Sequence, residues 1–142
     1  MTQQIMIQMQ YAAALISATM LLHALMIIAG RSLLLRRSVG SGVMGLASDT
    51  IRLVLISVWL FIAHIAAIWM WAWLYHLIGM NPTFEEALYF ALTTYTTLGF
   101  GDIVPTQDWR LLTGASSANG LLLFGLSAAV LVDATERLRQ GG

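Results

Sequence analysis

Thr-Thr-Tyr-Thr-Thr-Leu-Gly-Phe-Gly-Asp, residues 93–102, is the stretch that decides the fold of this chain. It follows a short amphipathic segment and precedes a long apolar one. Glycine tolerates positive φ, so Gly99 and Gly101 allow the backbone to alternate between conformations. Such alternation can turn successive carbonyl oxygens to one side, where they can replace the hydration shell of a cation. The simpler alternative is a glycine-containing turn between two membrane helices.

The composition around this stretch is that of a membrane protein. The chain has 142 residues, of which 58% are hydrophobic and 10% charged, and its mean hydropathy is +0.77. A soluble domain of this size could not bury so much apolar surface. Seven arginines balance seven acids, so we expect no nucleic-acid partner. There is no cysteine, no zinc-like histidine pair and no nucleophile–base set, so we expect neither an enzyme nor an organic cofactor.

Three apolar segments, at about 11–30, 51–78 and 111–132, are long enough to cross a bilayer. The first lacks a basic n-region, and its arginines follow the apolar run, which predicts a retained helix and not a signal peptide. A flexible connection is predicted at residues 38–42, and Asp49 is a predicted N-cap for the second span. The end of that span carries four aromatic residues, predicted to form an interfacial belt. They are Trp69, Trp71, Trp73 and Tyr75.

Residues 83–86, Thr-Phe-Glu-Glu, form a predicted capping box with Thr83 as N-cap. The helix that it begins ends near Tyr95 and is far too short to cross a bilayer. The arginines give the orientation. Arg31, Arg36, Arg37 and Arg52 lie between the first two spans, Arg137 and Arg139 follow the last, and Arg110 lies on the other side. The positive-inside rule therefore predicts an external N-terminus, an external 80–110 region and a cytoplasmic C-terminus.

Residues 96–102, Thr-Thr-Leu-Gly-Phe-Gly-Asp, resemble the signature filter of the tetrameric potassium channels. The order of span, pore helix, filter and span from about residue 50 to 135 is similar to that family as well. The resemblance implies that four chains each supply one filter strand and that the outer mouth is acidic at Asp102. It implies that K⁺, the permeant ion, binds the backbone carbonyls of the filter and the Thr97 hydroxyl. The filter residues are Thr97, Leu98, Gly99, Phe100 and Gly101.

The predicted fold is an all-α membrane protein with three transmembrane helices, a re-entrant pore helix and a selectivity-filter loop, assembled as a potassium-channel-like homotetramer. Residues 1–48 are predicted to form an extra N-terminal transmembrane helix and a cytoplasmic linker. Residues 49–142 form the pore module, with outer helix 50–79, pore helix 83–95, filter 97–102, inner helix 111–133 and a short tail. The expected location is the plasma (inner) membrane, with lipids and copies of the chain as partners and no small-molecule substrate.

The inner helix carries candidates for a cavity and a gate on one helical face. They are Ser117, Gly120, Leu121, Phe124 and Ala128. Gly120 is predicted either as a hinge, because glycine weakens a helix by ~1 kcal/mol relative to alanine, or as a site of close helix packing. Phe124 has a similar alternative, packing against a neighbour.

Four positions depart from the commonest pattern of the family. Phe100 replaces a tyrosine, and Leu98 replaces a valine or isoleucine. Thr93 stands where some members have a glutamate that pairs with the acid at Asp102. Val104 stands where an aromatic residue can hold external tetraethylammonium, so we expect weak block from outside.

Four polar residues lie in or near the apolar spans, where a polar side chain needs a partner or a function. His23, His64 and His76 are either pH sensors or packed and interfacial side chains. His64 is deep enough to need a partner. Asn119 is predicted to hydrogen-bond the pore-helix threonines. Two functions besides a K⁺-selective channel stay open: a weakly selective cation channel, and a non-conducting pore-like subunit that needs a partner.

Overall fold

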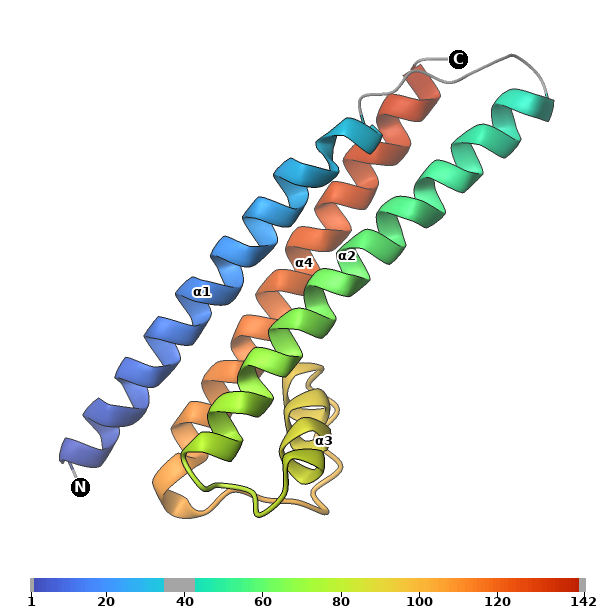
Figure 1. Ribbon diagram of the computed structural model, residues 1–142. Coiled ribbons are helices and arrows are strands. Elements are labelled where there is room, and N and C mark those ends of the chain that lie inside the picture. The colour runs from blue at the N-terminus through green and yellow to red at the C-terminus, as the bar shows by residue number, and fades with distance from the viewer. Residues whose placement is uncertain (1, 35–42, 141–142) are drawn as a thin grey trace.

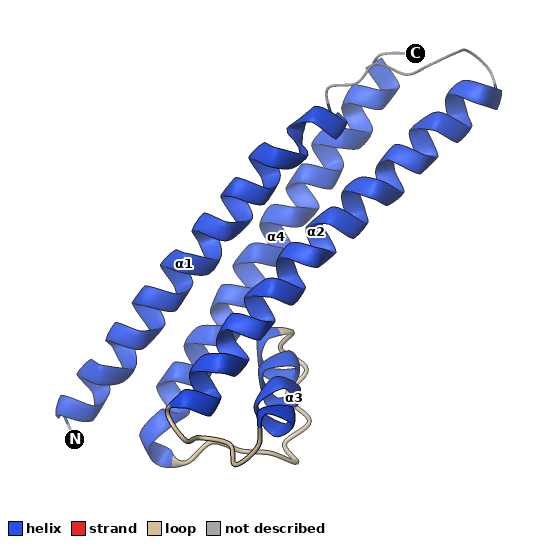
Figure 2. Ribbon diagram, in the orientation of Figure 1, coloured by secondary structure: helices blue, strands red, loops and turns tan. Residues whose placement is uncertain are grey.

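The structure, a computed structural model, describes residues 2–34 and 43–140. Its elements are α1 (Thr2–Leu34), α2 (Val43–Leu77), α3 (Phe84–Tyr95), the 3₁₀ turn η1 (Gln107–Trp109) and α4 (Arg110–Gln140). Three long helices run side by side, and the short α3 lies beside one end of them (Figure 1). The described residues contain helices and loops but no strand (Figure 2).

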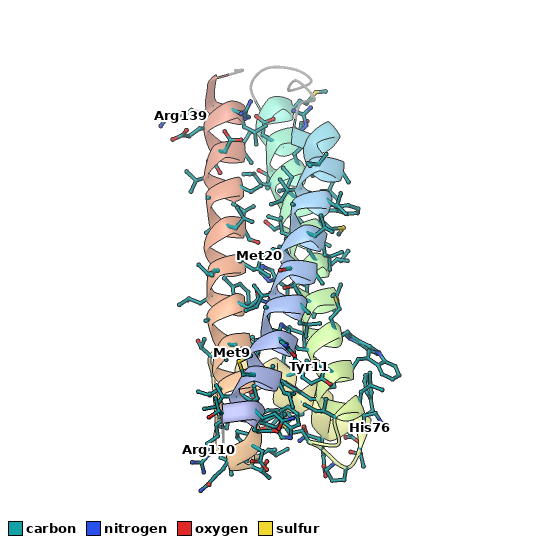
Figure 3. The ribbon with its side chains drawn as sticks, turned by 90° about the vertical axis from the view of Figure 1, so that its left-hand side faces the viewer. Met9, Tyr11, Met20, His76, Arg110 and Arg139 are labelled. Atoms are coloured by element: carbon teal, nitrogen blue, oxygen red, sulfur yellow. The ribbon has the colours of Figure 1, made fainter. Side chains whose placement is uncertain are left out.

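The three long helices, α1, α2 and α4, are each long and apolar enough to cross a membrane. The N-terminus, α3 and the start of α4 lie at one end, and the C-terminus lies at the other (Figure 1). Figure 3 shows Arg110 and His76 at the end with α3 and Arg139 at the opposite end. We call these the outer and inner ends, following the orientation predicted from the arginines.

Two helices begin earlier than the sequence predicted. α1 already starts at Thr2, because its glutamines and methionines are good helix formers and its first turns contact α4. α2 starts at Val43, so the prediction that Asp49 is an N-cap is wrong. Asp49 lies inside the helix and pairs with Arg52 one turn later at 3.5 Å. The connection predicted at 38–42 lies outside the described residues.

The main hydrophobic core joins all four helices, α1 to α4, in the outer half of the molecule. Its largest fully buried side chains are Trp71, Tyr75, Tyr95, Leu112 and Leu123. A smaller cluster of Ile56, Leu60 and Ala134 joins α2 to α4 nearer the inner end. Between the two clusters lie buried polar side chains, which we treat with the site below.

The aromatic belt at the end of α2 is only half interfacial. Trp69 and Trp73 are 45% and 50% exposed, as expected for an interface, and both rings contact Phe84. Trp71 and Tyr75 are fully buried, so their assignment to the belt is wrong. Residues four apart share one face of a helix and residues two apart do not. The four rings therefore split into a pair on the exposed face of α2 and a pair buried in the core.

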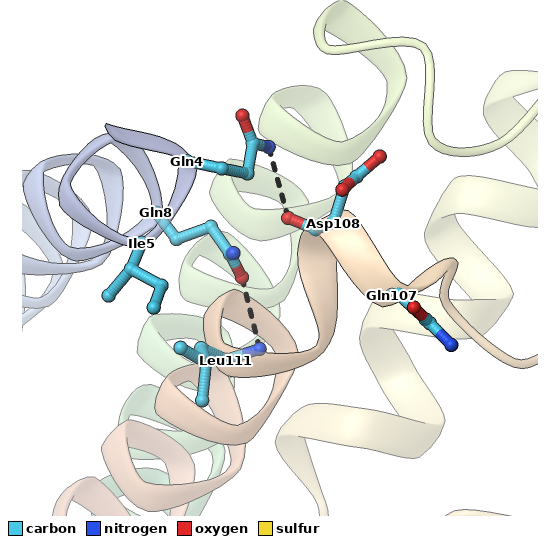
Figure 4. A pocket seen from close by; sticks show the side chains of 6 residues that line it. All are labelled: Gln4, Ile5, Gln8, Gln107, Asp108 and Leu111. Carbon is cyan, nitrogen blue, oxygen red and sulfur yellow. Dashed lines mark hydrogen bonds between the residues drawn. The ribbon is translucent and has the colours of Figure 1, made fainter. Parts of the chain in front are cut away.

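At the outer end, α1 is tied to the start of α4. The side-chain oxygen of Gln8 accepts hydrogen bonds from the backbone N–H groups of Leu111 and Leu112, at 3.0 and 3.1 Å. Gln4 donates to the carbonyl of Asp108 at 3.1 Å. Figure 4 shows both glutamines reaching across a pocket of about 320 Å³. Gln8 thus satisfies two of the N–H groups that the first turn of a helix leaves unpaired.

Two further polar contacts hold α1 along its length. Asn119 of α4 donates to the hydroxyl of Thr19 at 2.8 Å, and Trp59 of α2 donates to the carbonyl of Met26 at 2.8 Å. The prediction that Asn119 bonds the pore-helix threonines is therefore wrong. Asn119 lies on the α4 face that meets α1, and the face that meets α3 carries other residues.

Candidate functional site

The short helix α3 begins at the capping box that the sequence predicted. Thr83 has extended backbone angles, and its hydroxyl accepts a hydrogen bond from the N–H of Glu86 at 3.2 Å. Glu85 and Glu86 lie in the first turn, where a negative charge is favourable next to the positive end of the helix dipole. The N-cap assignment of Thr83 is confirmed.

α3 runs from the outer end into the middle of the bundle. Its last residue, Tyr95, lies against Gly120, which is ten residues into α4. Ten residues correspond to ~15 Å of helix. The chain then returns to the outer end, where η1 begins at Gln107. This in-and-out course is that of a re-entrant loop, which a membrane protein tolerates only where the backbone is buried in protein or lines water.

The chain that returns from α3, residues 97–102, pairs with no β-sheet in the described residues, and we call it the alternating strand. Its backbone φ angles change sign from one residue to the next. Thr97, Gly99 and Gly101 have positive φ angles of 61°, 51° and 82°, whereas Leu98 and Phe100 between them do not. For the two glycines this conformation costs little. For Thr97, a β-branched residue, it is a strained conformation that the surroundings must impose. An alternation of this kind is what a row of carbonyls facing one side requires.

Hydrogen bonds at the end of α3 hold the base of this strand. The carbonyl of Thr93 accepts from the N–H of Gly99 at 3.0 Å, and the carbonyl of Thr94 accepts from the N–H of Thr97 at 3.0 Å. The hydroxyl of Ser117 in α4 donates to the same Thr94 carbonyl at 2.8 Å. The strand is therefore anchored to α3 at its start and is free of main-chain pairing beyond Gly99 in the described chain.

The side chains of the strand are uncovered. Leu98 is 58% exposed and Phe100 66% exposed, and Gly101 and Asp102 are exposed as well. Two large apolar side chains that are exposed two residues apart on one loop add apolar surface of the kind that marks a contact site. In the described residues of one chain Leu98 and Phe100 are therefore largely uncovered, and a single strand encloses no path through the molecule.

Asp102 has a partner that the sequence analysis missed. The hydroxyl of Tyr89 donates to Asp102 Oδ2 at 2.7 Å, and Oδ1 accepts from the N–H of Ile103 at 3.1 Å. The hydrogen bond from Tyr89 lowers the pKa of Asp102 below its ordinary value, and it raises the pKa of Tyr89. Thr93, which stands where some members of the family have a glutamate that pairs with the acid, is buried, and its hydroxyl donates to the carbonyl of Phe90.

The position of Tyr89 explains why this residue, and not the residue at position 93, is the partner of Asp102. It lies four residues before Thr93, so the two are neighbours along one side of α3. The longer phenol, placed one turn nearer the outer end, reaches the carboxylate that a threonine cannot reach. The sequence signal that could have identified this partner of Asp102 is a tyrosine four residues before Thr93.

The inner-helix candidates separate into two groups. Ser117 and Gly120 face α3: Ser117 bonds Thr94, and a methyl group on Gly120 would collide with the carbonyl of Tyr95. Leu121 and Ala128 are exposed in the described chain. The helix is continuous through Gly120 from Arg110 to Gln140. The structure therefore shows close packing at Gly120, one of the two alternatives that the sequence left, and the hinge stays a prediction.

One face of Phe124 packs against neighbouring rings, as its alternative predicted, while the side chain as a whole is still 39% exposed. Its ring stacks on His64 of α2 with centroids 4.1 Å apart, and it lies 5.7 Å from the ring of Tyr95. His64 has the partners that its depth required: Nδ1 is 3.0 Å from the hydroxyl of Tyr95, and Nε2 is 2.9 Å from that of Ser127. Sequence reasoning asked for partners of His64 but could not name them, because they lie 31 and 63 residues away along the chain.

The other two histidines differ in environment. His23 of α1 is fully buried, with its ring 4.6 Å from that of His64. His76 is partly exposed among the aromatic rings of Trp73 and Phe84 at the outer end, which suits the interfacial interpretation. Within the described ranges, no group of three histidine or acidic side chains could hold a metal ion.

With this geometry in hand, the chain can be compared with known proteins. A family model described as "Ion channel" matches residues 50–137, which is more than half of the chain. The match covers nearly all of α2, the whole of α3, the alternating strand and most of α4, and leaves α1 outside. Comparison with curated proteins and with solved structures gave no significant match. The chain is an integral membrane protein that belongs to the ion channel family with the two-span, potassium-channel-like pore.

Proposed function

We propose that this ion channel is selective for K⁺ and conducts it through a filter made of backbone carbonyls from four copies of the chain. The observation that carries the proposal is the alternating backbone of residues 97–101 at the end of a re-entrant helix. Carbonyls of Thr97, Leu98, Gly99 and Phe100, with the Thr97 hydroxyl, would replace the hydration shell of the ion. Gly101 would carry the strand on to the outer mouth.

The exposed strand supports an assembly of several chains. A single strand offers ligands on one side of an ion only, and closed cyclic symmetry supplies the other sides with identical strands. The same assembly would cover Leu98 and Phe100, which one chain leaves open. One filter strand per chain gives four chains per pore in a homotetramer.

The charges at the outer end suit a cation pore. α3 directs its C-terminal end, the negative end of the helix dipole, toward the middle of the bundle. Asp102 stays ionised at lower pH than an ordinary aspartate because of Tyr89, and four copies would make the mouth acidic. We place the N-terminus outside and the C-terminus in the cytoplasm, in the plasma (inner) membrane of the cell.

The test is K⁺ flux from liposomes that contain the purified protein, with Gly99→Ala as the critical variant. Gly99 has a φ of 51° and no atom within 4 Å of an added methyl group, so alanine changes the backbone preference and creates no clash with its own chain. Gly79→Ala is the matched control, because Gly79 also has positive φ and open space but lies outside the filter. We expect Gly99→Ala to abolish K⁺-selective flux and Gly79→Ala to leave it intact.

The same preparation separates the competing functions. A reversal potential in mixed K⁺ and Na⁺ that follows K⁺ supports the proposal, and one midway between the two ions indicates a weakly selective cation channel. Flux that appears only when a second protein is co-expressed indicates a pore-like subunit that needs a partner. Flux unchanged by Gly99→Ala would contradict the filter assignment itself.

A further inference from the structure

His64 of α2 makes side-chain hydrogen bonds to both α3 and α4. It lies in the middle of α2 and is 4% exposed. Its Nδ1 meets the hydroxyl of Tyr95, the last residue of α3, at 3.0 Å. Its Nε2 meets the hydroxyl of Ser127 in α4 at 2.9 Å. The three side chains form a continuous buried bridge, which we call the Tyr95–His64–Ser127 bridge.

The bridge satisfies the imidazole completely. A neutral imidazole has one donor and one acceptor nitrogen, and a hydroxyl can play either part. Both hydrogen bonds therefore form in either tautomer. The orientation of the ring is fixed from two more sides, by Phe124 stacked on its face at 4.1 Å and by His23 of α1 against its edge at 4.6 Å.

The two ends of the bridge lie at functionally different places. Tyr95 immediately precedes the residues that begin the alternating strand, and its carbonyl lies against Gly120. Ser127 lies seven residues beyond Gly120 in α4, which is about two helical turns toward the inner end. A displacement of α4 at Ser127 therefore reaches the start of the strand through His64, by a route separate from the direct contact at Gly120.

We infer that His64 is a positioning residue that couples the inner half of α4 to the base of the filter through the Tyr95–His64–Ser127 bridge. The inference rests on the proposed function, since it assigns the bridge a part in a conducting pore. Such coupling requires an element with two positions, whose equilibrium is shifted both from the inner half of α4 and from the base of the filter. Here the element is α4, and the bridge passes its position to Tyr95.

The experiment is a double-mutant cycle on single channels in planar bilayers with Tyr95→Phe, Ser127→Ala and the two combined. Each variant removes one hydroxyl and keeps the ring or backbone in place. One hydrogen bond contributes ~1 kcal/mol, so each single variant should shift the closed–open equilibrium about fivefold for each of the four chains of the pore. Because either change breaks the same bridge, the double variant should shift it no further than the larger single effect. Ser127→Thr, which keeps the hydroxyl, should restore the wild-type equilibrium.

A matched control exists in the same two helices. The hydroxyl of Tyr75 in α2 donates to Ser116 in α4 at 2.7 Å, and both side chains are fully buried. This pair repeats the tyrosine and the serine of the bridge, and in the described residues it is not hydrogen-bonded to Tyr95 or His64. Tyr75→Phe and Ser116→Ala should lower thermal stability and leave the open equilibrium unchanged.

Three results would overturn the inference: independent, multiplying effects of Tyr95→Phe and Ser127→Ala; an open equilibrium that neither variant moves; or an equal response to the control pair. If the wild-type protein carries no K⁺ current, the proposed function fails separately. The same double-mutant cycle, measured on thermal unfolding in detergent, then tests whether the two hydrogen bonds of the bridge are coupled. Non-additive effects of the two substitutions on stability support the bridge, and additive effects refute it.

Discussion

Replacing Gly120 by alanine should separate α4 from the end of α3. The methyl group would collide with the backbone carbonyl of Tyr95, and a backbone group, unlike a flexible side chain, cannot rotate out of the way. Overpacking of this kind costs ~1–3 kcal/mol. Alanine also gains ~1 kcal/mol over glycine within a helix, which hides part of the cost.

The helix-propensity gain cancels when the comparison is made with another glycine of α4. An added methyl group meets nothing within 4 Å at Gly114 or at Gly125, so Gly114→Ala and Gly125→Ala report the gain alone. We therefore expect Gly120→Ala to be less stable than either control by ~1–3 kcal/mol per chain. Thermal unfolding of the purified proteins in detergent, followed by circular dichroism, measures the difference.

The same variants decide between packing and hinge. If Gly120 is a packing residue, Gly120→Ala loses stability and K⁺ flux together, because the end of α3 carries the start of the strand. A Gly120→Ala protein as stable as the Gly125→Ala protein, with altered opening only, would refute the packing argument and restore the hinge.

Three further predictions concern the outer end. Tyr89→Phe removes the hydrogen bond that lowers the pKa of Asp102, so that pKa rises toward its ordinary 3.8. As the external solution is acidified, the variant should therefore lose conductance at a higher pH than the wild-type channel. Loss of conductance at the same pH in both proteins would contradict the pairing of Tyr89 with Asp102. Gln8→Ala leaves two N–H groups of α4 uncapped and should cost ~1–3 kcal/mol in thermal unfolding, while Gln10→Ala, at an exposed position, should cost nothing measurable. External tetraethylammonium should block weakly, because Val104 offers no ring, and tight block measured in bilayers would count against the resemblance at this position.

Features that depend on neighbours along the chain were predictable. Thr83 caps α3 because an N-cap needs only a hydroxyl and the N–H three residues later. The positive φ angles at Gly99 and Gly101 were predictable because a residue without a side chain permits them in a loop. The three spans follow from length and apolarity, whatever their partners are. Asp49 failed as a cap because helix starts are weakly marked where good helix formers continue on both sides.

Features that depend on the rotation of one helix against another were beyond the sequence. Trp71 and Trp73 differ only in the face of α2 that they occupy, and the packing of the helices decided that Trp71 lies in the core. Tyr89 became the partner of Asp102 through the fold of the loop after α3, and Asn119 that of Thr19 through the packing of α4 against α1. A single apolar segment contains no record of its rotation about its own axis.

The amino-acid sequence by itself determined that the chain spans a membrane, re-enters it once and carries an alternating strand, because each of these is a property of a local run of residues. The tertiary structure decided which side chains support that strand. Tyr95, His64 and Ser127 come from three helices, and Gly120 lets two of them approach. Contacts across such distances arise only when the packing of the helices brings the faces together.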